Sequence, residues 1–381
     1  MTRIISKLKS YRYRHFHIGL FICVCALTIV GILAIASATD SNVYEKKQVL
    51  GFILGMVIAI FATFIDYKFL LKFSIIIYIF NLVLLVWVKV GGSHHMGATR
   101  WIDLGFFQLQ PSELTKIFLI LFFAYFLEQH KDSINTWKTL GITVLLFLIP
   151  LGLILAQPDL STSVVIVLMF CGIMYVAGLS YKIIGGIIVA CIPVVVIFIY
   201  LIMQPNQKFL FIRGYQLGRI TSFMNDTAEN KDARRQQENS IMAIGSGGLY
   251  GKGLNNNTTT SLKNGQYLSE PQTDFIFCII GEELGFIGTS LVILLLFLIV
   301  MFCFYIGAHA PDLSGKVIAC GYGFLIGIQS FVNIGVVTMI MPNTGLPLPF
   351  VSYGLTSLIS MFIGFGVVLN ISLQHSEISY Q

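Results

Sequence analysis

Charged residues are scarce in this sequence. Asp, Glu, Lys and Arg make up 11% of its 381 residues, whereas soluble proteins carry about a quarter. Hydrophobic residues account for 56% and the mean hydropathy is +0.83. Apolar runs of about 20 residues, each long enough to cross a bilayer as a helix, recur along almost the whole chain. The composition therefore excludes a soluble globular protein, and the unbroken runs exclude a transmembrane β-barrel, whose strands are shorter and alternate.

The sequence also lacks the cysteine spacing of a zinc or redox site. Its seven cysteines are odd in number, they form no CxxC pair, and all of them lie in apolar runs. We interpret them as small hydrophobic residues without a chemical role.

Apolar windows predict an all-α polytopic membrane protein with about ten transmembrane helices in a single transmembrane domain, 1–381. The run at 17–38 follows basic residues and ends in Ala-Ser-Ala, but it is too long for a signal peptide and is interpreted as a retained helix. The run at 275–306 is too long for one straight span, and Gly281, Gly285 and Gly288 are the places where it could bend. The expected spans lie near 17–38, 48–66, 69–90, 113–129, 139–156, 160–179, 182–203, 275–306, 315–341 and 350–373.

The distribution of Lys and Arg predicts the orientation of these helices. With the N-terminus inside, the short inner segments hold more Lys and Arg than the short outer ones, so both termini, including the tail 1–17, are expected in the cytoplasm. Residues 204–272 then form a large extracellular loop between the seventh and eighth helices. Nearly all unusual polar residues fall in outer connections, and loops often carry function. We therefore expect the chemistry on the outer face.

The first outer motif is GATRWIDLG, with Arg100 and Trp101, followed by QPSELTK. Pro111 and Ser112 predict a helix start, with Ser112 as the N-cap. Glu113 and Lys116 then form an i, i+3 pair inside a span. The pair could neutralise itself and hold helices together, or it could serve function, as ionisable groups inside membranes often do. The sequence leaves both interpretations open.

Asp159 follows Pro158 at the start of another predicted helix. A carboxylate at a helix N-terminus is stabilised by the helix dipole. Capping alone would explain this residue, and a direct role in catalysis is the alternative.

The large outer loop contributes Arg213 and Arg219, and then a glycine-rich run at 243–253 that contains Lys252. The run lacks the spacing of a P-loop and lies in no strand–helix–strand unit. Its backbone amides could form a nest for an anion, with Lys252 and the arginines adding positive charge. The alternative is a flexible loop that needs glycine for its turns.

Asp274 lies at the expected outer boundary of the membrane, where a helix begins after a proline. Partial desolvation there should raise the pKa of Asp274 toward the range of a general base. A simple helix-starting carboxylate is the alternative. Glu282 lies about 12 Å further along the helix, at a greater depth.

The last outer motif contains three prolines among apolar residues and ends in Ser352 and Tyr353. It predicts a rigid, non-helical turn. Its apolar character suits a wall for a lipid-bearing substrate.

Five ordered motifs resemble the SEDS (shape, elongation, division, sporulation) family of bacterial cell-wall polymerases, and most closely its RodA branch. They are GATRWIDLG…QPSELTK, QPDLSTS, AIGSGGLYGKGL, EPQTDFIFCIIGEELGFIG and GLPLPFVSYG, and with the ten-span topology they cover essentially the whole chain. One departure is Gln272, where the family commonly has a histidine.

The resemblance implies a peptidoglycan glycosyltransferase that joins lipid II units in cell-wall elongation and cell-shape control. Asp274 corresponds to the family's essential aspartate, Glu113 and Lys116 to its Glu/Lys pair, and Asp159 to the aspartate of its QPD motif. Loop arginines, Lys252 or a divalent cation such as Mg²⁺ would stabilise the diphosphate leaving group. The implied partner is a class B penicillin-binding protein, the transpeptidase that cross-links the strands, and no nucleic acid is expected.

Three other functions remain compatible with the sequence. A lipid II flippase or transporter would suit many helices with intramembrane charges. A division-branch polymerase of the FtsW type shares the same motifs. A scaffold that only activates a partner enzyme is the third.

Overall fold

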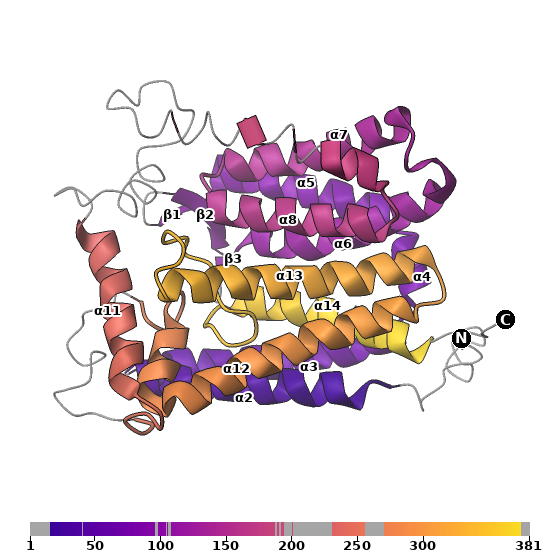
Figure 1. The fold of residues 1–381 in the computed structure, drawn as a ribbon. Helices are drawn as coiled ribbons and strands as arrows, with labels where there is room; N and C mark the ends of the chain where they lie inside the picture. Colours follow the sequence, from indigo (N-terminus) through magenta and orange to yellow (C-terminus); the bar gives the residue numbers. More distant parts are fainter. Residues whose placement is uncertain are drawn as a thin grey trace.

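The computed structural model describes residues 16–39, 41–95, 98–103, 105, 108–186, 189, 192–193, 200, 231–255 and 270–374. Long helices run side by side in a bundle, with a small antiparallel sheet and one crossing helix at the same end (Figure 1). Seven of the described helices are long and apolar enough to span a membrane. The protein is thus an all-α polytopic membrane protein, as the sequence predicts.

The helices of the first half follow the expected spans closely. The break between α4 and α5 was not predicted: the Asp66 carboxylate caps α4 by accepting from the Lys68 amide at 3.0 Å. The bounds are α2 (Ile18–Ala38), α3 (Asn42–Phe64), α4 (Tyr67–Leu71), α5 (Ser74–Gly91), α6 (Pro111–Gln129), η2 (Lys131–Ser133), α7 (Trp137–Leu155) and α8 (Leu160–Val176).

In the second half, α11 (Lys231–Gly247) forms within the predicted outer loop, and α12 (Ile276–Ala308), α13 (Leu313–Val337) and α14 (Leu355–Leu373) follow. The last predicted span begins at 355 rather than 350, because the proline-rich segment stays non-helical. Most of the span expected at 182–203 lies outside the described residues. The sheet contains β1 (Ser93–His95), β2 (Ala98–Asp103) and β3 (Gln108–Leu109), paired antiparallel in that order.

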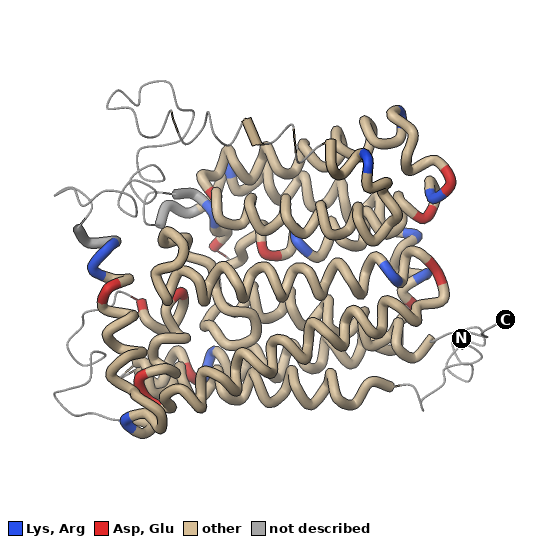
Figure 2. Tube along the Cα trace, in the orientation of Figure 1, with Lys and Arg blue, Asp and Glu red and all other residues tan. Residues whose placement is uncertain are grey.

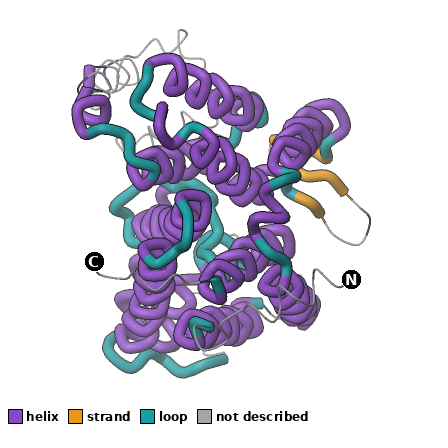
Figure 3. Tube along the Cα trace, turned by 90° about the vertical axis from the view of Figure 1, so that its right-hand side faces the viewer, coloured by secondary structure: helices purple, strands orange, loops and turns teal. Residues whose placement is uncertain are grey.

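The helices α13 and α14 form the centre of the bundle. Their most apolar windows are 72% and 78% buried, whereas those of α3 and α5 are each 28% buried and expose apolar side chains on the outside. Figure 3 shows the bundle of helices nearly end-on. Close packing relies on small residues: a Cβ on Gly366 of α14 would lie 2.5 Å from the Ala59 carbonyl oxygen of α3.

The predicted bend in the eighth span occurs at Gly285, where the backbone of α12 has φ 64° and ψ −160°. The turn that follows α11 packs against α12 at this break. The amides of Lys252 and Gly253 donate to the carbonyls of Glu282 and Glu283 at 2.9 and 3.0 Å. These two amides are therefore engaged by α12, and the proposed anion nest is wrong for them. Residues 243–247 belong to α11, so the flexible-loop interpretation is also wrong for that part.

Charged residues gather at the two ends of the bundle (Figure 2). The sheet and α11 lie at one end, whereas the start of α2, the end of α14 and the connection between α6 and α7 lie at the other (Figure 1). The motif residues of 98–103, 108–116, 157–162, 243–254 and 270–283 therefore lie at or near the end that the charge distribution predicts to be outside.

Candidate active site

Asp274 lies in the turn at 271–275 that leads into α12, and its side chain is half-buried. The side-chain amide of Asn333 on α13 donates to the Asp274 carbonyl at 2.9 Å and to the Leu346 carbonyl at 2.6 Å. Asn333 is only 1% exposed. Because one buried donor joins both carbonyls, the backbone at Asp274 is held against α13 and the proline-rich segment.

The proline-rich segment 342–354 supports the same turn from a second side. Ser352 Oγ donates to the Thr273 carbonyl at 2.6 Å and accepts from the Leu348 amide at 2.7 Å. The Tyr353 amide donates to the Gln272 carbonyl at 2.9 Å. Ser352 and Tyr353, predicted as substrate-supporting residues, thus contact the backbone that carries Asp274. The segment is non-helical, as predicted.

Glu113 and Lys116 form a buried ion pair in the first two turns of α6. Lys116 Nζ lies 2.7 Å from Glu113 Oε1, and the two side chains are 0% and 2% exposed. Lys116 also donates to Gln329 Oε1 of α13 at 2.8 Å, and Gln329 Nε2 donates to the Pro347 carbonyl at 2.8 Å. The pair is therefore linked through Gln329 to the segment that supports the Asp274 turn.

Asp159 caps α8, as one sequence interpretation predicts. Its Oδ1 accepts from the Thr162 amide at 3.2 Å and its Oδ2 accepts from the Ser112 hydroxyl at 3.3 Å. The N-cap of α6 is Gln110, with Pro111 at the first helical position. The prediction that Ser112 caps α6 is therefore wrong, because Ser112 lies inside the first turn and its hydroxyl is directed to Asp159.

Arg100 and Trp101 lie on β2. The Arg100 guanidinium lies 3.8 Å from Asp159 Oδ1 and donates to the carbonyls of Pro158 and Gln157. The hairpin is thereby joined to the turn between α7 and α8. Trp101 pairs through its backbone with Ser93 in the sheet, and its side chain is half-buried.

Lys252 Nζ forms an ion pair with Glu282 Oε1 at 2.8 Å, and the Glu282 side chain is 1% exposed. Glu282 is buried whereas Asp274 is half-buried, and the greater membrane depth expected for Glu282 stays a prediction. Both cations have a carboxylate partner, but Lys252 is paired at 2.8 Å whereas the Arg100 guanidinium lies 3.8 Å from Asp159. Lys252 is therefore the weaker candidate for stabilising a leaving group. Arg213 and Arg219 lie outside the described residues.

Sequence reasoning missed Asn333 and Gln329. Both are amide side chains inside an otherwise apolar span, and polar residues at such positions usually have a specific partner. They are four residues apart and so lie on one face of α13, where both bind the proline-rich segment.

The described residues do not provide a set of ligands for a metal ion. No three His, Cys, Asp or Glu side chains among the described residues could hold one. Glu113 and Glu282 are paired with lysines and Asp159 caps a helix. We derive no step through a divalent cation, and the expected Mg²⁺ stays a prediction.

Comparison with known proteins places the chain in a family. The model of the FtsW, RodA and SpoVE family, described as "Cell cycle protein", matches residues 10–377. Peptidoglycan glycosyltransferase MrdB of Escherichia coli K12 is 34% identical over 366 residues, which cover 96% of this chain and 95% of that protein. Stage V sporulation protein E of Bacillus subtilis is 35% identical over 372 residues, covering 93% and 96%.

Solved structures support the same family assignment. A chain of a peptidoglycan synthase complex, described as coordinating polymerization and crosslinking, superposes with a TM-score of 0.78 at 27% identity, covering 94% of this chain and 97% of that one. The rod shape determining protein RodA of Thermus thermophilus superposes with a TM-score of 0.69 at 27% identity, covering 95% and 98%. The chain therefore belongs to the FtsW/RodA/SpoVE, or SEDS, family of multi-pass membrane proteins.

Proposed function

We propose that this protein is a peptidoglycan glycosyltransferase that polymerises lipid II into glycan strands on the outer face of the bacterial cytoplasmic membrane. The name and sequence identity of MrdB support the reaction class. The observation that carries the site is the half-buried Asp274, whose backbone carbonyl is fixed by the buried Asn333. A carboxylate held in this way at the end of the bundle suits general-base chemistry on a membrane-anchored substrate.

Asp274 acts on the acceptor. Its carboxylate takes the proton from the 4-hydroxyl of the acceptor's N-acetylglucosamine, and that oxygen attacks the anomeric carbon of the donor's N-acetylmuramic acid. The new glycosidic C–O bond forms with inversion as the bond to the diphosphate oxygen breaks. Undecaprenyl diphosphate leaves with the bonding electron pair, and the proton stays on Asp274 until it passes to solvent.

The diphosphate needs charge stabilisation more than it needs a proton. Arg100 is the described cation best placed for this role, because its guanidinium has five N–H groups and makes two hydrogen bonds to backbone carbonyls. Its planar fork matches phosphate oxygens. Arg219 and Arg213 of the outer loop are further candidates on the basis of the family resemblance.

We place both termini in the cytoplasm and assign the protein to cell-wall elongation, with a class B penicillin-binding protein as its partner. The excess of Lys and Arg in the inner segments supports the orientation. The similar synthase complex supports the partner, because it is described as coordinating polymerization with crosslinking.

Purified protein in detergent or nanodiscs, incubated with lipid II, tests the proposal. We expect glycan strands that a muramidase digests, with a rate that increases when the cognate transpeptidase is added. Translocation of fluorescent lipid II across vesicles without any polymer would instead support a flippase. Polymer formation only by the transpeptidase partner would support an activating scaffold.

A further inference from the structure

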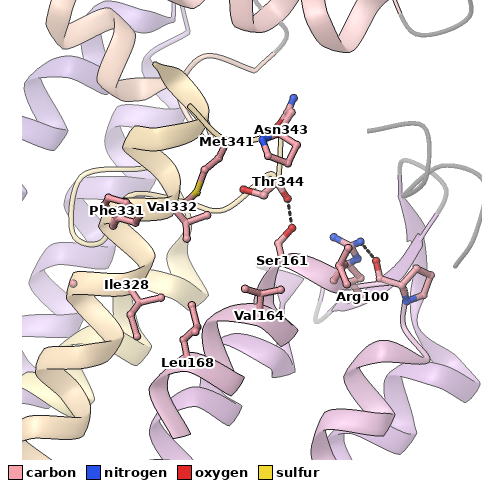
Figure 4. A pocket seen from close by; sticks show the side chains of 14 residues that line it. Arg100, Ser161, Val164, Leu168, Ile328, Phe331, Val332, Met341, Asn343 and Thr344 are labelled. Atoms are coloured by element: carbon pink, nitrogen blue, oxygen red, sulfur yellow. Dashed lines mark hydrogen bonds between the residues drawn. The ribbon is translucent and has the colours of Figure 1, made fainter. Parts of the chain in front are cut away.

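A pocket of about 430 Å³ lies between α8 and α13 (Figure 4). Its walls are apolar: α8 supplies Leu160, Val164 and Leu168, and α13 supplies Ile328, Phe331 and Val332. The proton transfer at Asp274 uses none of these wall residues.

The apolar walls face the outside of the bundle. Val164 and Leu168 are each 45% exposed, and Phe331 is 64% exposed. In a spanning bundle such surfaces face hydrocarbon rather than water. The pocket is therefore accessible to a lipid chain from the side, through the bilayer.

One end of the pocket is polar. Arg100, Ser161, Asn343 and Thr344 line it, and a hydrogen bond from Ser161 Oγ to the Thr344 carbonyl joins α8 to the proline-rich segment there (Figure 4). The Arg100 side chain is 18% exposed and lies 3.8 Å from Asp159 Oδ1. Its five N–H groups exceed the two that donate to backbone carbonyls.

Two buried polar atoms at this end of the pocket also lack a hydrogen-bond partner within the described residues. Asn343 is 8% exposed, and neither its Oδ1 nor Thr344 Oγ1 has a hydrogen-bond partner within the described part of the chain. Buried polar atoms without partners cost free energy. A small side-chain rotation toward a polar ligand group would recover it, since Thr344 can donate to a phosphate oxygen and Asn343 can accept from a sugar N–H or O–H.

We propose that this pocket binds the polyprenyl diphosphate end of the donor. The first isoprene units lie between Val164 and Phe331, and the diphosphate lies at Arg100. The apolar walls suit the isoprenoid chain, the cation suits the diphosphate, and the unsatisfied polar pair suits the sugar. The assignment rests on the proposed function, because that reaction releases a polyprenyl diphosphate.

The position relative to Asp274 supports the assignment. Thr344 and Leu346 belong to one short segment, and the Leu346 carbonyl shares its Asn333 donor with the Asp274 carbonyl. The polar end of the pocket and the proposed general base are thus held by the same segment. A lipid bound in the pocket would thus contact the segment that also holds the Asp274 turn.

The test measures binding of labelled geranylgeranyl diphosphate to purified protein in phosphatidylcholine nanodiscs. Val164→Trp fills the pocket, and Val83→Trp, on a lipid-facing position of α5 that is 53% exposed, is the matched control. We expect Val164→Trp to weaken binding at least tenfold and Val83→Trp to leave it within twofold. If Val164→Trp does not yield folded protein, Ile328→Trp on the facing wall replaces it.

Competitors identify the occupant. Unlabelled geranylgeranyl diphosphate should displace the label far more effectively than inorganic diphosphate, geranylgeraniol or phosphatidylglycerol. Equal affinity in the two tryptophan variants, or equally effective displacement by phosphatidylglycerol, would overturn the proposal. Because binding requires no polymerisation, this result is independent of whether the protein makes glycan strands.

Discussion

The buried side-chain amide of Asn333 donates hydrogen bonds to the backbone carbonyls of Asp274, at 2.9 Å, and Leu346, at 2.6 Å. A helix at the centre of the bundle thereby sets the position of the turn that carries the proposed general base. The proposed catalytic geometry is thus supported by a residue that lies in a span and belongs to none of the outer motifs.

Asn333→Ala should lower kcat tenfold or more with little change in KM, because a shift of about 1 Å in a catalytic group can cost about 100-fold in rate. Lipid II polymerisation by purified variants measures this. Asn135→Ala is the matched control: Asn135 also ties two segments, at Ser180 and Gly178, but at the opposite end of the bundle. Equal loss of kcat in both variants would show that Asn333 has only a general structural role.

The Glu113–Lys116 pair can be assigned to structure or function by a double substitution. Glu113→Gln or Lys116→Met alone should destabilise the protein by about 3–5 kcal/mol, because each leaves a buried charge without its counterion. Glu113→Leu combined with Lys116→Met should recover most of that stability in thermal unfolding. Recovery of polymerisation in the double variant would make the pair structural, whereas a stable but inactive double variant would make it functional.

Gly285→Ala should destabilise the packing of the turn after α11 against α12. Gly285 has φ 64°, and an added Cβ would lie 2.3 Å from the Gly251 amide nitrogen, so the substitution disrupts the contact between the turn after α11 and α12. Gly141→Ala in α7, where an added Cβ would meet nothing within 4 Å, should be neutral or slightly stabilising. Hydrogen exchange of α11 measures the difference. Unchanged protection of α11 in Gly285→Ala would contradict this account of the break.

Asp312 is the N-cap of α13 at the end of the bundle opposite the sheet, and it predicts a pH dependence of stability. Burial raises the pKa of this carboxyl, but hydrogen bonds from Lys68, the Gly315 amide and the Tyr67 hydroxyl outweigh burial and hold the pKa below its usual range. A lowered folded-state pKa stabilises the protein above the unfolded pKa of about 3.9, and the gain is lost as the pH falls through the folded value. The Tm of wild type should therefore fall more than the Tm of Asp312→Asn when the pH is lowered from 5 to 3. Parallel curves would contradict this.

Hydropathy predicted the helices because each membrane span needs a long apolar run. The length of the run at 275–306 predicted a bend at one of three glycines, and the structure places it at Gly285. Hydropathy missed α11, since this helix is polar and buries Gln237 and Ser240 against α13. A window average cannot detect that kind of packing.

For the candidate site, the sequence predicted the key residue but not its surroundings. Ordered motifs singled out Asp274 as the candidate. The contacts of Ser352 with Thr273 and of Asn333 with Asp274 join residues distant in sequence. A single sequence carries no signal for such pairs. The capping role of Asp159 was predictable because it depends only on neighbouring residues, whereas its bond with Ser112 was not.

The most direct test of the central claim compares purified wild type with Asp274→Asn in lipid II polymerisation. The substitution keeps the size of the side chain and removes its basic carboxylate. Glu238→Gln, an exposed carboxylate on α11 paired with Arg234, is the control. We predict no polymer from Asp274→Asn, with geranylgeranyl diphosphate binding retained, and a normal rate from Glu238→Gln. Polymerisation by Asp274→Asn at the wild-type rate would contradict the assignment of Asp274 as the general base.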